Sequence, residues 1–249
     1  MSNSITGIIP ARAGSLRIPN KNSLQLNGRP IISYSIASAK LSGCFDKVVV
    51  ASDDEDVCNV GAEYGADIVV KRNSQDATVS SLDIDWLRNL QKSGFIETKY
   101  FAILRPTSPQ RSAELIRKCT ESFLASDFDS LRTIKKVTEH PGKMWRLDDN
   151  SEVIPYLAQA NGEPATHAMQ YQSLEPLYVQ TSVYEIARTQ NIMLTSSREG
   201  KSVLGYLTSG LDTFALDTLE DLDYLNYLLQ TFPNLLTEVS PTLGSKEPK

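Results

Sequence analysis

Short apolar runs alternate with amphipathic segments over most of the chain. Runs rich in apolar and β-branched residues predict buried strands at residues 6–10, 47–51, 67–70, 100–104, 130–134 and 203–207. Segments between them predict helices at residues 30–39, 80–91, 113–124 and 218–229. Strands that alternate with helices form βαβ units, so the sequence predicts an α/β fold with a mostly parallel sheet flanked by helices.

Local signals suggest where several helices begin. Ser52 is the expected N-cap of a helix whose first turn carries acidic residues at 53–56. Pro30 suits the first turn of its helix, and Asp217 has the position of an N-cap for the last helix. One face of the helix at 80–91 is expected to be buried through Leu82, Trp86, Leu87 and Leu90.

The pattern becomes irregular beyond residue 138, and alternation typical of a strand returns at residues 178–187. We expect a main domain of residues 1–138 and 178–235, an inserted arm at 139–177 and a flexible tail at 236–249. The arm carries apolar side chains suited to an exposed interface: Met144, Trp145, Tyr156 and Leu157. The alternative is a lid that covers the chain's own site.

Composition excludes several classes of function. The 249 residues carry a formal charge of −5 and no long basic run, so nucleic acid is not an expected partner. No apolar run approaches the ~20 residues that span a bilayer, and no signal peptide is visible, so we expect a cytoplasmic protein without membrane contact. The cysteines form no CxxC pair, which argues against a disulfide framework or a zinc site: Cys44, Cys58 and Cys119.

The loop at residues 10–22 carries the strongest chemical signal. It follows the first strand at the carboxyl edge of the sheet, where open α/β sheets bind ligands. Ala13 and Gly14 are small enough for a ligand to approach the backbone, whose N–H groups can bind an anion. The loop also holds the cations that a triphosphate requires: Arg12, Arg17 and Lys21. The alternative is a solvated basic loop, and the sequence is neither GxGxxG nor GxxxxGK[ST].

Several segments, taken in order, resemble one family. ARAGS followed by KN in the first loop, VVVASDDEDV at 48–57, LRPTSPQR at 104–111 and FALDTLEDL at 214–222 resemble the acylneuraminate cytidylyltransferases, which include CMP-sialic, legionaminic and pseudaminic acid synthetases. The resemblance spans residues 5–230. It implies a Rossmann-like nucleotidyltransferase sheet with an inserted dimerisation arm. It also implies Mg²⁺-dependent transfer of CMP from CTP to a nonulosonic acid, with release of pyrophosphate, by a homodimer.

The resemblance also implies roles for individual residues. Those matching the catalytic positions are Arg12, Lys21 and Asp217, the last also as metal ligand. Those matching nucleotide-binding positions are Ala11, Arg12, Gly14, Ser15, Arg17, Lys21, Asn22, Arg72 and Ser81. Those matching sugar-binding positions are Arg105, Thr107, Ser108, Lys143, Gln172 and Gln180. Without the family, Thr107 and Ser108 have the character of caps for the next helix, and both histidines, His140 and His167, are expected to cap or pack.

Some positions depart from the family pattern. Leu16 stands where many relatives have lysine, and Ala215 stands where the metal-binding pair has its first aspartate. Residues 169–176 lack the family's arginines. Two further hypotheses therefore remain open. One is transfer of a nucleotide, such as GMP, to a neutral sugar 1-phosphate, and the other is a catalytically inactive nucleotide-binding homologue.

Overall fold

The computed structural model describes residues 4–15, 17–72, 82–157, 165–194 and 197–242. The chain divides into two compact units, the first made of Met1–Thr133 with Thr181–Lys249 and the second of Ile134–Gln180. The second unit contains the predicted insertion at 139–177 and extends beyond it at both ends. The reason is that the strands leading into and out of it, β7 (Ser130–Lys136) and β10 (Tyr178–Arg188), belong partly to each unit.

A mixed sheet forms the centre of the first unit. In the described part of the chain it has seven strands in the order β11-β7-β10-β6-β1-β4-β5. β1 (Ile5–Pro10) runs parallel to its neighbours β4 (Lys47–Ser52) and β6 (Tyr100–Ile103). The edge strand β5 (Ile68–Lys71) runs parallel to β4, and β10 is antiparallel to β6. The last strand is β11 (Val203–Leu207). The predicted α/β class with a mostly parallel sheet is confirmed.

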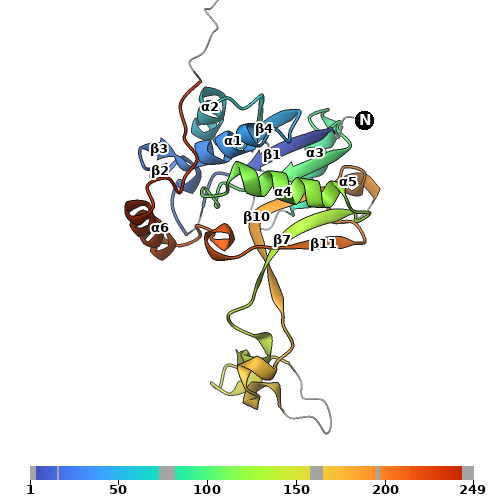
Figure 1. Ribbon diagram of the computed structural model, residues 1–249, viewed down its shortest axis with the longest axis vertical. Coiled ribbons are helices and arrows are strands. Elements are labelled where there is room, and N and C mark those ends of the chain that lie inside the picture. Colours follow the sequence, from blue (N-terminus) through green and yellow to red (C-terminus); the bar gives the residue numbers. More distant parts are fainter. Residues whose placement is uncertain (1–3, 16, 73–81, 158–164, 195–196, 243–249) are drawn as a thin grey trace, which may run out of the picture. The chain divides into compact units, whose positions relative to one another are not determined.

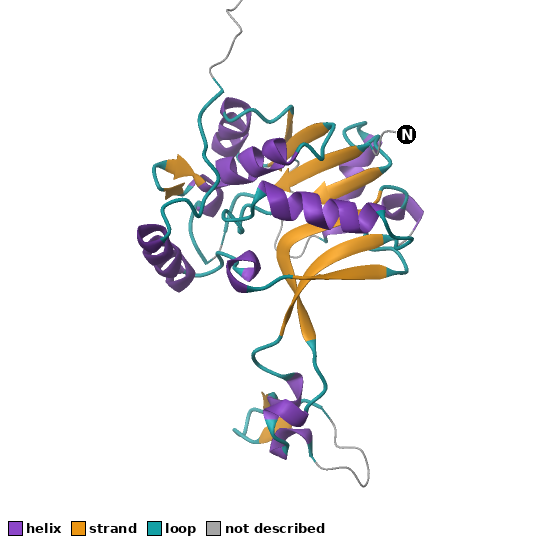
Figure 2. Cartoon of the chain, viewed as in Figure 1, coloured by secondary structure: helices purple, strands orange, loops and turns teal. Residues whose placement is uncertain are grey.

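Helices cover both faces of this sheet (Figures 1 and 2). Ile9 packs into one apolar cluster with α1 (Ile31–Ser42), α2 (Glu55–Glu63) and α4 (Ala113–Leu124). Its neighbour Ile8 packs into a second cluster with α3 (Asp83–Lys92) and the short α5 (Asn191–Leu194). Successive strand residues point to opposite faces, so one apolar run supplies both layers of the core.

Several predicted helix starts are wrong by a few residues. Asp54 caps α2, because its side chain accepts the N–H groups of Asp56 and Val57. Ser52 instead ends β4 and accepts the N–H of Asp54 at 3.0 Å. Leu82 precedes α3 and is 65% exposed, so it does not join the buried face.

Prolines and hydroxyls also act differently from expectation at two other helices. Pro30 lies before α1 with extended backbone, where it belongs to the short hairpin of β2 (Gln25–Leu26) and β3 (Arg29–Pro30). Ser112 caps α4 by accepting the N–H of Leu115 at 3.1 Å. Thr107 and Ser108 therefore do not cap that helix, which leaves them available for other contacts.

The second unit is a small irregular fold. Its hairpin pairs β8 (Trp145–Leu147) with β9 (Val153–Pro155). The 3₁₀ turn η3 (Pro141–Lys143) precedes the hairpin, and η4 (Thr166–Ala168) and η5 (Tyr171–Ser173) follow it. His140 caps η3 by accepting the N–H of Gly142, and the ring of His167 lies 4.6 Å from that of Trp145. The prediction that both histidines cap or pack is confirmed.

The segment after the last helix packs on the first unit. Val239 contacts two of its apolar clusters, and the N–H of Thr242 donates to the carbonyl of Glu63 at 2.9 Å. Residues 236–242 therefore include contacts with the rest of the first unit, and the flexible tail expected at 236–249 stays a prediction. Residues 243–249 lie outside the described part of the chain.

Candidate active site

The predicted anion-binding loop leaves the sheet at the carboxyl end of β1. The N–H of Ala11 still pairs with the carbonyl of Ala51, and then the chain turns away. Gly14 has φ +69°, a left-handed conformation that strains any residue with a Cβ, and nothing in the described chain lies within 4 Å of where that Cβ would be. The turn is therefore open, and its backbone is accessible on the Gly14 side.

Two side chains fix the middle of this loop. Asp53, directly after β4, accepts the N–H of Ala13 at 2.7 Å. The amide of Asn22 donates to the carbonyl of Arg12 at 2.9 Å. Sequence reasoning assigned Asn22 to the nucleotide and treated Asp53 only as an acidic residue of a helix turn. The structure shows that both hold the Arg12–Ala13 backbone, and the signal for Asp53 was its position at the end of a strand next to β1.

An apolar cluster brings the loop to the end of the chain. Ile18 of the loop and Leu216 are both buried in it, together with Tyr34 of α1 and Leu225 of α6 (Leu219–Thr231). This packing aligns a loop residue with one almost two hundred positions later. It explains why the polar neighbours of Ile18 and Leu216 meet at the surface of the cluster.

Lys21 and Asp217, two of the predicted catalytic residues, form an ion pair there. The Lys21 Nζ donates to the Asp217 Oδ1 at 3.2 Å and to the carbonyl of Leu216 at 3.0 Å. The Lys21 side chain is 13% exposed and that of Asp217 is 42% exposed. The structure thus brings together residues that the sequence predicted separately.

Asp217 is not the cap of α6. Thr218 caps that helix by accepting the N–H of Asp221, whose Oδ2 accepts the N–H groups of Asp217 at 2.9 Å and of Thr218 at 2.8 Å. Burial disfavours the charge of Asp221, but these N–H donors outweigh it and lower its pKa. The helix is capped without the Asp217 carboxylate, which is free to meet a cation.

The loop at residues 105–111 holds the segment before Asp217 in place. The N–H of Leu216 donates to the carbonyl of Thr107 at 2.7 Å. The hydroxyl of Ser108, which is fully buried, and the amide of Gln110 both donate to the carbonyl of Phe214. The hydroxyl of Ser108 is therefore engaged inside the protein, and the loop supports the segment that precedes Asp217.

Arg111 also holds the loop at residues 105–111 in place. Its guanidinium is completely buried and donates to the carbonyls of Arg105 and Val183 and to the hydroxyl of Ser35, at 3.1, 2.8 and 2.7 Å. Burial lowers the pKa of Arg111 to about 9. A buried cation on neutral partners is uncommon and identifies Arg111 as a positioning residue for the loop.

Arg105, a predicted sugar-binding residue, belongs to an ionic network. It pairs with Asp83 of α3, and its Nε lies 3.6 Å from Glu185 of β10. Burial opposes its charge, but Glu185 and Asp83 outweigh that and raise the pKa of Arg105. Its positive charge is therefore already matched by carboxylates.

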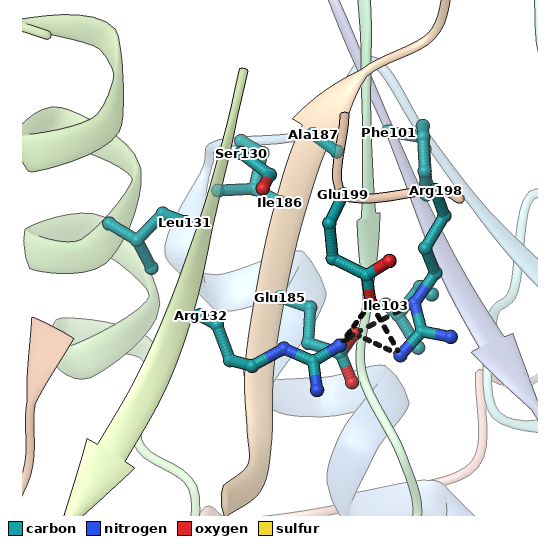
Figure 3. Close-up of a pocket in the computed structure, with 10 residues that line it drawn as sticks. All are labelled: Phe101, Ile103, Ser130, Leu131, Arg132, Glu185, Ile186, Ala187, Arg198 and Glu199. Atoms are coloured by element: carbon teal, nitrogen blue, oxygen red, sulfur yellow. Dashed lines mark hydrogen bonds and ion pairs between the residues drawn. The ribbon is translucent and has the colours of Figure 1, made fainter. Parts of the chain in front are cut away.

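The network continues around Glu185 (Figure 3). Arg132 contacts Glu185 at 2.9 Å and Glu199 at 2.6 Å, and Arg198 contacts Asp83 and Glu185 at 2.8 and 2.9 Å. The cavity beside it measures about 10 Å³, room for about one water. Sequence reasoning missed these partners of Arg105, because they come from distant segments and no motif contains them.

The remaining nucleotide-site predictions lie around the same sheet edge or outside the described residues. Arg72 follows β5, donates its N–H to the carbonyl of Ser52 at 2.7 Å and lies 5.2 Å from the ring centre of Trp86. Arg17 is exposed, and Ser15 is partly exposed. Leu16 and Ser81 lie outside the described residues.

In the second unit, Lys143 is engaged by its own fold. Its Nζ donates to the carbonyls of His167 and Met169. Gln172 lines a cavity of about 200 Å³ together with His140 and Tyr171, and Gln180 is exposed on β10. Lys143 therefore stabilises the turn at η4, and Gln172 is the predicted sugar residue of this unit that faces a cavity.

The oxygen atoms around Lys21 suit a hard divalent cation. The Asp217 carboxylate and the Leu216 carbonyl already face one positive charge. Mg²⁺ prefers such oxygens and keeps waters and substrate phosphates as its other ligands. Among the described residues no group of three or more His, Cys, Asp or Glu side chains could hold a metal. The role of Asp217 as a metal ligand stays a prediction. No helix in the same part of the chain is long and apolar enough to cross a membrane.

The chain is similar to known proteins over most of its length. Residues 6–231 match the family model described as Cytidylyltransferase. The chain is 29% identical over 216 residues to an N-acylneuraminate cytidylyltransferase of Streptococcus agalactiae, covering 86% of this chain and 50% of that protein. It is 37% identical over 154 residues to a CMP-N,N'-diacetyllegionaminic acid synthase of Legionella pneumophila, covering 60% of this chain and 66% of that one.

Solved structures share the fold. A CMP:2-keto-3-deoxy-manno-octonic acid synthetase complexed with CTP superposes with a TM-score of 0.67 at 15% identity, over 92% of this chain and 99% of that one. The chain spans about half the length of the Streptococcus agalactiae relative.

Proposed function

We propose that this chain, which belongs to the cytidylyltransferase family, transfers CMP from CTP to a nonulosonic, sialic-acid-like sugar acid and releases pyrophosphate. The observation that carries the proposal is the meeting of Lys21 and Asp217 beside the loop that Asp53 holds open. A cation, a carboxylate able to bind a metal and a glycine turn with an accessible backbone are parts that nucleotidyl transfer uses. The names of the curated relatives supply the donor and the class of acceptor.

The chemistry follows from these parts. A sugar hydroxyl attacks the α-phosphorus and loses its proton to water, so that the new P–O bond forms. The bond from the α-phosphorus to the pyrophosphate oxygen breaks. Arg12, Arg17 and the N–H groups after Ala11 hold the triphosphate and stabilise its charge. When bound at Asp217, Mg²⁺ would neutralise charge on the leaving pyrophosphate. Asp53 and Asn22 keep the loop in its binding conformation.

The base and ribose lie, in this proposal, between the first loop and Arg72. In this proposal the sugar meets Thr107 of the loop at 105–111. Arg105 contributes its guanidinium edge, since its charge is already matched by Asp83 and Glu185.

Pyrophosphate release tests the reaction. The protein is incubated with Mg²⁺, each of the four NTPs and either a sialic-acid-like sugar acid or a neutral sugar 1-phosphate. We expect release only with CTP and a sugar acid. Release with a sugar 1-phosphate and GTP would favour the alternative acceptor. Tight CTP binding without release from any sugar would favour an inactive homologue.

We also propose a cytoplasmic homodimer formed through the arm. In the described part of the second unit an apolar surface is exposed on and beside the hairpin: Met144, Trp145, Leu147, Val153, Ile154, Tyr156 and Leu157. Such a surface normally marks an interface. Light scattering at micromolar concentration should give twice the 27.6 kDa of one chain. A monomeric mass would contradict the dimer.

A further inference from the structure

The charge of Lys21 is already paired within the protein in the absence of substrate. Its ammonium makes contacts with Asp217 and the Leu216 carbonyl, and its side chain is only 13% exposed. Arg17, on the same loop, is exposed. The loop therefore offers one cation to solvent and keeps another on the carboxylate that a metal would use.

Backbone contacts fix both ends of this pair. On the loop side, Asn20 adopts a left-handed φ of 52°, and its carbonyl accepts the N–H groups of Ser23 and Leu24, which locks the turn that carries Lys21. On the other side, Asp221 holds the N–H of Asp217. With both backbones fixed, the freedom that remains belongs to the Lys21 and Asp217 side chains.

Asp217 cannot bind both Lys21 and a metal ion at full strength, and Lys21 cannot bind both Asp217 and a triphosphate at full strength. While Lys21 lies on Asp217, it lowers the negative potential that attracts a divalent cation, and its charge is matched before a triphosphate can use it. A metal ion on Asp217 would repel the ammonium, and a triphosphate would attract it. Each ligand therefore favours the rearrangement that the other needs, which by linkage makes their binding mutually reinforcing.

We propose that Lys21 is an internal counter-ion of Asp217 that a divalent cation and the triphosphate displace together. The inference rests on the proposed function and adds a coupling between metal and nucleotide at that site. Lys21 holds Asp217 in the nucleotide-free protein, and it turns to the triphosphate when the metal takes the carboxylate. The expected coupling lies in the usual range of about 5- to 150-fold.

Manganese binding, followed by the EPR signal of free Mn²⁺, tests this without activity. Lys21→Met removes the competing cation, so we expect the nucleotide-free variant to bind Mn²⁺ about 5- to 10-fold more tightly than the wild type, at the low end of that coupling range. In the variant, CTP should then increase Mn²⁺ affinity much less than it does in the wild type. Lys21→Arg restores a cation and should restore weak Mn²⁺ binding.

Lys40→Met is the matched control. Lys40 pairs with Asp67 at 2.6 Å on the protein surface, so this change also removes one charge and frees one aspartate. We expect its Mn²⁺ affinity to equal that of the wild type. An equal increase in Mn²⁺ affinity in Lys21→Met and Lys40→Met would show that the increase comes from the change in net charge, and it would overturn the proposal.

Other outcomes separate the inference from the proposed function. Unchanged or weaker Mn²⁺ binding by Lys21→Met, with CTP still bound by the wild type, would refute the counter-ion and leave the function standing. Failure of the wild type to bind CTP would refute the proposed function. Comparing the Mn²⁺ affinities of the wild type and Lys21→Met without nucleotide would still test whether Lys21 competes with the metal for Asp217. Should Lys21→Met fail to fold, Asp217→Asn decides the question, because retained Mn²⁺ affinity in that variant would overturn the proposal.

Discussion

Asp53 offers a sharp test of how the first loop is held. Its carboxylate accepts the N–H of Ala13 at 2.7 Å and is the link from β4 to the middle of the loop. Asp53→Ala removes the acceptor, so the loop must be ordered by the nucleotide itself. Asp53→Asn removes only the charge, because the amide oxygen can still accept the same N–H.

The structure sets the size of the effect. A hydrogen bond to a charged group contributes about 1.5–3 kcal/mol, which corresponds to a loss of roughly 10- to 100-fold in affinity when it orders a binding loop. Removing a negative charge near the triphosphate acts in the opposite direction, and Asp53→Asn isolates that effect. We therefore expect CTP to bind more weakly to Asp53→Ala, and as tightly or more tightly to Asp53→Asn.

Isothermal titration with CTP and Mg²⁺ measures both variants. Asp56→Ala is the control, since Asp56 is exposed in the first turn of α2 and supplies its backbone, not its carboxylate, to the cap. Equal affinity of Asp53→Ala and the wild type would refute the claim that this bond preorganises the loop. A parallel loss in Asp53→Asn would show that charge, rather than the hydrogen bond, is responsible.

Other predictions follow from the ionic network, the core and the metal site. Burial opposes the charge of Asp83, but Arg105 and Arg198 outweigh it and lower the pKa of Asp83 from 3.8. As pH falls, Asp83 therefore takes up a proton in the unfolded state before it does so in the folded state. The stability that its ion pairs contribute is lost as pH falls from about 4 through the folded pKa. Thermal unfolding of Asp83→Asn should depend less on pH in that window, and an unchanged slope would contradict the assignment. Tyr184→Phe removes a buried hydrogen bond to Thr120 and should cost about 1 kcal/mol, seen as a Tm lower by roughly 2–4 °C. EDTA should abolish turnover if Mg²⁺ acts at Asp217, and unchanged turnover in EDTA would contradict the proposed metal site.

The sequence predicted the sheet and its helices because they depend on local pattern. Apolar runs and amphipathic spacing are properties of neighbouring residues, and helices such as α4 begin and end where the pattern places them. Helix caps were less predictable, since Asp217 and Thr218 are both good caps. The capping box between Thr218 and Asp221 was visible in the spacing and decides between them.

The site was predictable where a motif carried it and not where tertiary packing created it. The cations of the first loop and Asp217 were found from short motifs, whereas their meeting depends on Ile18 and Leu216 sharing one apolar cluster. The ion-pair partners of Arg105 come from α3 and β10, and no sequence spacing relates Asp83 to Glu185. Charges read from a motif can thus be neutralised by residues that the motif does not contain.

A crystal structure of the protein with CTP and Mg²⁺, without sugar, tests the central claim most directly. The account predicts the triphosphate against the N–H groups that follow Ala11, with Arg12 on a phosphate oxygen and the metal on Asp217. A triphosphate bound elsewhere, or an Arg12 side chain directed into solvent while CTP is bound, would contradict it.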